Sequence, residues 1–208
     1  MTANMRVIRM GKHSNTVFLE KIGMVWLKAN HCYIISPETK IWRNRLYPQG
    51  ELDNHYIIDL LGVGTKWVPE EKRMANEHGY KSPTITILRG IEIKISLSDF
   101  KNGFIYGGCN YNYLMTPKGL ITKDKVPKGI GLIEVDLETF TWRKWGMKYY
   151  FDGLKLITKP KYKEISDFQF DYATRETAYN CSNQMILWAR DQLPKHVHLN
   201  GGSEDEVK

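Results

Sequence analysis

The feature that most constrains the fold of this chain is a series of short apolar segments between two longer segments with helical periodicity. Each short segment has the length of a strand and ends at glycine, proline or polar residues. The segment 32–39 predicts a strand that is stopped by Pro37. Further strands are predicted at 55–64, 86–95, 111–117 and 131–136, with a sixth in 140–150 or 153–159. The order helix, strands, helix predicts an α/β or α+β fold with a central mixed sheet flanked by helices.

The two helical segments are residues 15–30 and 167–193. In the first, Asn15 is the expected N-cap. A core face at helical spacing is expected from Phe18, Ile22, Val25, Trp26 and Ala29. In the second, the expected buried stripe is Ala178, Met185, Ile186 and Ala189. Residues 65–83 are charged and broken by proline and glycine, so they predict an excursion with at most a short helix at 70–77.

Length and composition indicate one globular domain. The chain has 208 residues, a length that suits a single domain, here predicted at 15–195. An N-terminal extension is predicted at 1–14 and a disordered tail at 196–208. The net charge of +7 suits a polyanionic partner such as nucleic acid. Three widely spaced cysteines argue against a disulfide framework and for a reducing cytoplasm. The sequence contains no apolar run long enough for a membrane span.

Three ionisable residues on two predicted strands form the strongest candidate site. In residues 86–95, alternation places Ile91 and Ile93 on one face and Glu92 and Lys94 on the other. Asp59 interrupts an otherwise apolar strand, where an ionised carboxylate is unfavourable unless it is paired or bound to a cation. Consecutive strands are usually neighbours, so Asp59, Glu92 and Lys94 are expected to converge. Two carboxylates beside a lysine can hold Mg²⁺ (or Mn²⁺), and the lysine can orient or activate an attacking water.

These residues resemble the motif of the PD-(D/E)XK nuclease superfamily. "IID" at 57–59 followed by "IEIK" at 91–94 matches its pattern of an acidic residue, a variable gap, then Asp or Glu, any residue and Lys. The run "IEIKISLSDF", then "YLMTP" and "VPKGIGLIEVD", is similar to the MmcB-like branch associated with DNA repair. The match covers about residues 15–136, with Ile58 in the place of the motif's proline.

The resemblance implies a restriction-endonuclease-like core and a set of residue roles. Asp59, Glu92 and Ile93 are implied as metal ligands, Lys94 as the catalytic lysine, and Glu20 as an accessory acid near the metal. The implied activity is Mg²⁺-dependent hydrolysis of phosphodiester bonds in DNA. The family usually packs a longer helix after the lysine strand, whereas "KNGFIYGGCNYNY" at 101–113 contains three glycines and makes a poor long helix.

Two basic segments mix cations with aromatic residues, a combination that can grip a phosphate backbone and stack on bases. The first contains Arg43 and Arg45, and the second contains Arg143 and Lys144. The same pattern also fits strands with aromatic core faces and solvated cations.

Three functions therefore remain open. The first is a nuclease acting on nucleic acid, expected to be DNA, with a homodimer as one arrangement for cutting both strands of a duplex. The second is a non-catalytic nucleic-acid-binding or assembly subunit that retains the nuclease fold. The third is a hydrolase of small phosphorylated molecules with the same metal site.

Overall fold

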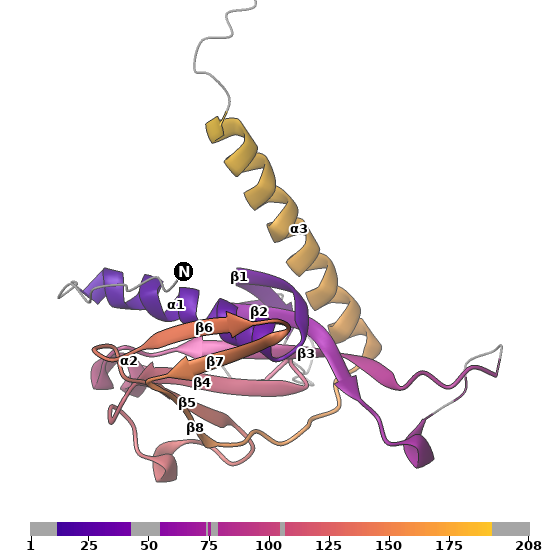
Figure 1. Ribbon diagram of the computed structural model, residues 1–208, viewed down its shortest axis with the longest axis horizontal. Helices are drawn as coiled ribbons and strands as arrows, with labels where there is room; N and C mark the ends of the chain where they lie inside the picture. Colours follow the sequence, from indigo (N-terminus) through magenta and orange to yellow (C-terminus); the bar gives the residue numbers. More distant parts are fainter. Residues whose placement is uncertain (1–11, 43–54, 74, 76–78, 105–106, 193–208) are drawn as a thin grey trace, which may run out of the picture.

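A six-stranded mixed sheet forms the centre of the protein, with helices on both of its faces (Figure 1). The computed structural model describes residues 12–42, 55–73, 75, 79–104 and 107–192. The predicted α+β class with a central mixed sheet is confirmed. The predicted tail at 196–208 and nearly all of the extension at 1–14 lie outside the described residues. Within the described part of the chain, no helix is long and apolar enough to cross a membrane.

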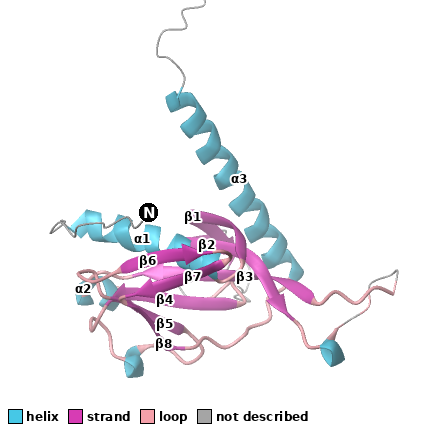
Figure 2. Cartoon of the chain, viewed as in Figure 1, coloured by secondary structure: helices cyan, strands magenta, loops and turns pink. Residues whose placement is uncertain are grey.

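The sheet has the strand order β1-β2-β3-β4-β5-β8. The pairs β1–β2, β2–β3 and β5–β8 are antiparallel, and β3–β4 and β4–β5 are parallel. A separate hairpin consists of β6 and β7 (Figure 2). The strands are β1 (Cys32–Trp42), β2 (His55–Trp67), β3 (Thr84–Ile93), β4 (Tyr111–Pro117), β5 (Gly131–Val135), β6 (Thr141–Trp145), β7 (Lys148–Asp152) and β8 (Leu154–Thr158).

The remaining elements are helices, most of them short. They are α1 (Lys12–Ala29), α2 (Leu97–Lys101), α3 (Asp167–Gln192) and two 3-10 turns, η1 (Glu70–Lys72) and η2 (Lys123–Lys125). Both alternatives for a sixth strand form strands. Segment 153–159 contains β8 of the main sheet, and segment 140–150 contains β6 and the start of β7 in the hairpin. The short α2 agrees with the glycine-rich composition that follows it.

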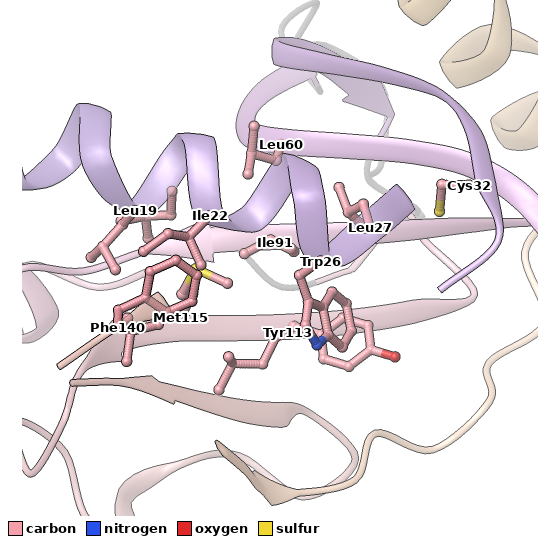
Figure 3. Packing of buried hydrophobic residues seen from close by; sticks show 13 residues of the cluster. Leu19, Ile22, Trp26, Leu27, Cys32, Leu60, Ile91, Tyr113, Met115 and Phe140 are labelled. Carbon is pink, nitrogen blue, oxygen red and sulfur yellow. The ribbon is translucent and has the colours of Figure 1, made fainter. Parts of the chain in front are cut away.

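Helix α1 covers one face of the sheet and builds the larger core (Figure 3). Its buried side is slightly rotated from the predicted one and includes Leu19 and Leu27. The sheet contributes Leu60, Ile91 and Met115 to the same cluster. A side chain at Gly23 would collide with Leu60 Cδ1, which would have to move. The glycine therefore lets the helix approach the sheet closely.

The ends of α1 correct one sequence prediction. The helix starts at Lys12, so Asn15 lies inside it and is not the N-cap. A cap preference of about 1 kcal/mol does not stop a helix that can continue through the residues before it. At the other end, Asn30 Nδ2 donates a hydrogen bond to the Trp26 carbonyl at 2.8 Å, and His31 adopts a left-handed φ of 65° that turns the chain into β1.

Strand β1 continues through Pro37, which the sequence predicted as its stop. The strand lies at the edge of the sheet, where a proline is tolerated because its missing N–H can face away from the neighbouring strand. Pro37 stays in register with Leu60 of β2.

Helix α3 packs on the opposite face from α1, through a stripe that differs from the predicted one. Ala173 is fully buried in a cluster with Ile58, Leu61 and Leu88. Thr177 is also fully buried. In contrast, Ala178 is exposed, Met185 and Ile186 are 71% and 62% exposed, and the Ala189 side chain lies outside the description. The predicted stripe is wrong for two reasons. Ala178 faces away from the sheet beside the buried Thr177. Met185 and Ile186 are exposed because the C-terminal end of α3 extends beyond the sheet (Figure 1).

Candidate functional site

The β2 backbone becomes irregular around Asp59. Ile58 packs in the cluster under α3, whereas Leu60 packs in the cluster under α1. Residues two apart in a regular strand share a face, so the strand alternation is broken between these two positions. The β1–β2 register passes over Glu38, which has a left-handed φ of 44°. Asp59 thus lies at a local break in the strand alternation, opposite Glu38 and with no extra residue in either strand.

The regular pairing between β2 and β3 begins at Leu60, so Asp59 lies just outside it. The Asp59 side chain continues the contact between the two strands. The first matched pair is Leu60 with Ile91. Two residues further along β3, the Ile93 N–H donates a hydrogen bond to Asp59 Oδ2 at 2.5 Å. The Lys94 N–H donates a hydrogen bond to the Met115 carbonyl of β4. Because successive residues of a strand direct their main-chain groups to opposite sides, the N–H and the carbonyl of Ile93 point toward β2. The carboxylate therefore occupies the position that a main-chain carbonyl would take in an unbroken ladder.

Glu92 and Lys94 form a buried ion pair on the face of β3 away from α1. Lys94 Nζ lies 3.2 Å from Glu92 Oε1, and the two side chains are only 12% and 7% exposed. Their face is set by strand alternation, because Ile91 and Ile93 belong to the cluster under α1. An ion pair with so little exposure carries a large desolvation penalty, so it depends on close contact between its charges.

A third carboxylate, Asp99, reaches the same lysine. Asp99 Oδ1 is 3.5 Å from Lys94 Nζ, and Oδ2 accepts a hydrogen bond from the Ile95 N–H at 3.4 Å. Helix α2 positions it, because the Asp99 N–H donates to the side chain of the N-cap residue Ser96. Sequence reasoning missed this residue. The available signal was the pattern Ser96-x-x-Asp99, typical of a helix start, directly after the lysine strand.

Electrostatics connects Asp59 to this group. Burial raises the pKa of Asp59, while the hydrogen bond from Ile93 and the charge of Lys94 act to lower that pKa and Asp99 acts to raise it. The cluster of Asp59, Glu92, Asp99 and Lys94 has three carboxylates for one ammonium group. We call these four residues the carboxylate–lysine cluster. Its excess of negative charge favours binding of a cation.

The oxygen donors of this cluster are chemically compatible with Mg²⁺ or Mn²⁺. Carboxylate and main-chain carbonyl oxygens are the hard ligands that these ions prefer. Asp59, Glu92 and the Ile93 carbonyl, which points to the β2 side where pairing has ended, would hold the ion. Over the part of the chain that the structure describes, no group of three or more His, Cys, Asp or Glu side chains has the arrangement of a metal site. Any ion here would therefore depend on two side chains together with the main chain and water.

The other predicted site residues are more scattered. Glu20 is half-buried on α1, which covers the face of β3 opposite to Glu92 and Lys94, and its accessory role stays a prediction. Arg43 and Arg45 lie outside the described residues. Arg143 and Lys144 lie on the exposed strand β6 of the hairpin.

Comparisons with known proteins add little to this picture. The sequence matches no protein-family model and no curated protein. Among solved structures, the chain is similar to SPO1766, a protein of unknown function from Silicibacter pomeroyi, over 64% of this chain and 84% of that one. The two share 10% sequence identity with a TM-score of 0.38. A similarity this weak bears on neither fold nor function.

Proposed function

We propose that this protein is a Mg²⁺-dependent nuclease that hydrolyses phosphodiester bonds of DNA. The observation that carries the proposal is the hydrogen bond from the Ile93 N–H to Asp59, which brings Asp59 to the strand that bears Glu92 and Lys94. This is the constellation expected from the resemblance to the PD-(D/E)XK superfamily. A restriction-endonuclease-like core, a role in DNA repair and a cytoplasmic location belong to the same proposal, and a homodimer is the form suited to cutting both strands.

The residues of the cluster have distinct roles in this proposal. Asp59 and Glu92 bind the divalent ion, which when present would stabilise negative charge on the phosphate oxygens. Lys94 holds and orients the attacking water, since its ammonium group already lies among the carboxylates. Asp99 helps to position Lys94, because its carboxylate lies 3.5 Å from the ammonium group.

The test separates metal binding from cleavage. Mn²⁺ is titrated by calorimetry into the wild type, Asp59→Asn and Glu92→Gln, and Mg²⁺-dependent cleavage of plasmid and oligonucleotide DNA is measured for each. We expect both variants to lose binding and cleavage. Lys94→Met, assayed at a temperature where circular dichroism shows that it is folded, should retain metal binding and lose cleavage. Glu134→Gln is the control, because Glu134 is also a strand glutamate, lies on β5 two strands from Glu92 and accepts a hydrogen bond from the Gly119 N–H. Equal metal binding and cleavage in the wild type and Glu92→Gln would refute the proposal.

A second function is a nucleic-acid-binding or assembly subunit without turnover. It is favoured by the ion pair between Lys94 and Glu92, which engages both groups with each other, and by the absence of a three-side-chain metal group within the described ranges. This function predicts salt-dependent binding to DNA that persists in Glu92→Ala and needs no divalent ion. Failure to bind any DNA or RNA at low salt would reject it.

A further inference from the structure

The hairpin of β6 and β7 carries an unusual set of exposed aromatic and cationic side chains. All five residues of β6 are exposed. At the tip, Trp145 is 82% exposed and Met147 is 92% exposed. The turn between them contains Gly146 with a left-handed φ of 58°, which glycine adopts without strain. Large apolar side chains exposed this fully, and next to one another, indicate an interaction surface.

The register of the hairpin defines two different faces. Residues directly opposite share a face, so Trp142 and Phe151 lie on one side and Arg143 and Tyr150 on the other. Phe151 stacks on Phe140 and packs against the core under α1, which attaches the first face to the protein. The second face consists of Arg143, Tyr150, Trp145 and Lys148 near the tip, with Thr141 and Asp152 at its base. We call the first four residues the hairpin surface.

Within the hairpin surface, cations flank the aromatic rings. Arg143 Cζ lies 5.6 Å from the centre of the Tyr150 ring. Lys148 is directly opposite Trp145. Among the described residues, no aromatic or cationic group is in ring contact with Trp145, so its ring presents an open face to a ligand. No ion pair of Arg143 or Lys148 occurs in the same part of the chain.

This chemistry matches single-stranded nucleic acid better than a duplex. An unpaired base offers a flat π-face for stacking, and the phosphates on either side of it offer negative charge to nearby cations. In a duplex the base faces are already stacked on one another, and a protruding indole ring gains no comparable contact. The chain as a whole carries a net charge of +7, which is complementary to the same ligand.

We infer that the hairpin surface binds an unpaired stretch of nucleic acid, with one base stacked on Trp145 and adjacent phosphates at Arg143 and Lys148. This inference rests on the proposed function in that it defines the substrate class as one with single-stranded regions, such as a flap, an overhang or a displaced strand. The hairpin joins the sheet on the α1 side, whereas Glu92 and Lys94 lie on the other face of β3. Binding at the hairpin can therefore be measured separately from metal binding at the carboxylate–lysine cluster.

The experiment measures binding of the full chain to fluorescein-labelled oligothymidine and to a blunt duplex of equal length, by anisotropy at low salt with a chelator present. We expect the single strand to bind more tightly than the duplex. Trp145→Ala should weaken single-strand binding about tenfold, as expected for the loss of one stacked base. Trp145→Phe should retain most of the affinity. Arg143→Gln combined with Lys148→Gln should reduce the slope of the logarithm of the binding constant against the logarithm of the salt concentration by about 1.4.

Trp67→Ala is the matched control. Trp67 is also an exposed tryptophan, 62% exposed and stacked with Arg73 at 4.9 Å, but it lies on β2 outside the hairpin. Its replacement should leave oligonucleotide binding unchanged. The inference is overturned if Trp145→Ala binds like the wild type, if duplex and single strand bind equally, or if Trp145 is needed only for binding to anionic lipid vesicles.

The same variants distinguish the two proposals. If the nuclease proposal fails and the hairpin inference holds, no metal-dependent cleavage is seen while single-strand binding still depends on Trp145. If the inference fails and the nuclease proposal holds, cleavage requires Glu92 while Trp145→Ala cleaves and binds like the wild type.

Discussion

The Asp59 side chain accepts a hydrogen bond from the main-chain N–H of Ile93, a residue 34 positions later in the chain. The bond forms just beyond the last regular pair of β2 and β3, so a carboxylate replaces a main-chain acceptor at the point where the two strands separate. The same carboxylate lies within the electrostatic influence of Lys94. One side chain thus closes the end of a strand pair and supplies an acidic group to the candidate site.

This relationship predicts opposite stability effects for two replacements of Asp59. Asp59→Ala should lower the free energy of unfolding by about 1–3 kcal/mol, because the Ile93 N–H loses its acceptor. Asp59→Asn should be at least as stable as the wild type, since the amide oxygen still accepts the bond and no charge is buried. Urea denaturation of the three proteins checks this. Equal destabilisation by both replacements would show that the charge of Asp59 is needed for stability.

Loss of Lys94 should destabilise the protein strongly unless Glu92 is neutralised with it. Lys94→Met leaves a carboxylate that is 7% exposed without its counter-charge, and removing one partner of such a pair costs about 3–5 kcal/mol. Adding Glu92→Gln should restore much of the loss. A double-mutant cycle by urea denaturation measures the coupling. The exposed pair of Lys118 and Asp136, at 2.9 Å, is the control and should show little coupling. Additive effects of the two cluster variants would contradict the prediction.

Stability should fall at high pH through Tyr113. Burial raises the pKa of Tyr113 from 10.0 to about 12, against the opposing influence of Arg89. The folded protein therefore holds the phenol proton more tightly than the unfolded chain. Its contribution to stability is complete below pH 10 and is lost as the pH rises toward 12. Urea denaturation of the wild type and Tyr113→Phe is measured from pH 8 upward in steps of about one pH unit. The difference between their free energies of unfolding should change in this window. A constant difference would argue against the buried phenol.

The two halves of α3 should respond differently to polar substitution. Met185→Gln and Ile186→Gln together should leave the unfolding temperature nearly unchanged, because both side chains are mostly exposed. Ala173→Asp should lower it greatly, since this position is fully buried in the cluster with Ile58 and Leu88. Thermal denaturation followed by circular dichroism provides the measurement. Destabilisation by the Met185 and Ile186 variant at a concentration where the protein is monomeric would mean that the outer half of α3 is packed.

Local sequence patterns were sufficient to predict much of the sheet and three of the four residues of the carboxylate–lysine cluster. The alternation of Ile91 and Ile93 with Glu92 and Lys94 defines which side chains share a face, because a strand has a period of two residues. The apolar runs predicted five strands of the central sheet and gave β8 as one of two alternatives for the sixth. The end of β1 shifted because this edge strand accepts Pro37. The neighbouring position of β2 and β3 followed from their order in the chain.

Other features depend on contacts between distant segments. Periodicity alone gave Met185 and Ile186 the appearance of core residues, but a helix buries only the residues that the sheet is long enough to cover. Asp99 joined the cluster because Ser96 starts α2 directly after β3 and turns the carboxylate back toward Lys94. The bond between Asp59 and Ile93 required the strand distortion at Ile58 and Asp59. Local residue patterns determine which side chains share one face of a helix or strand. Which other elements pack against that face is determined by the packing of the whole chain.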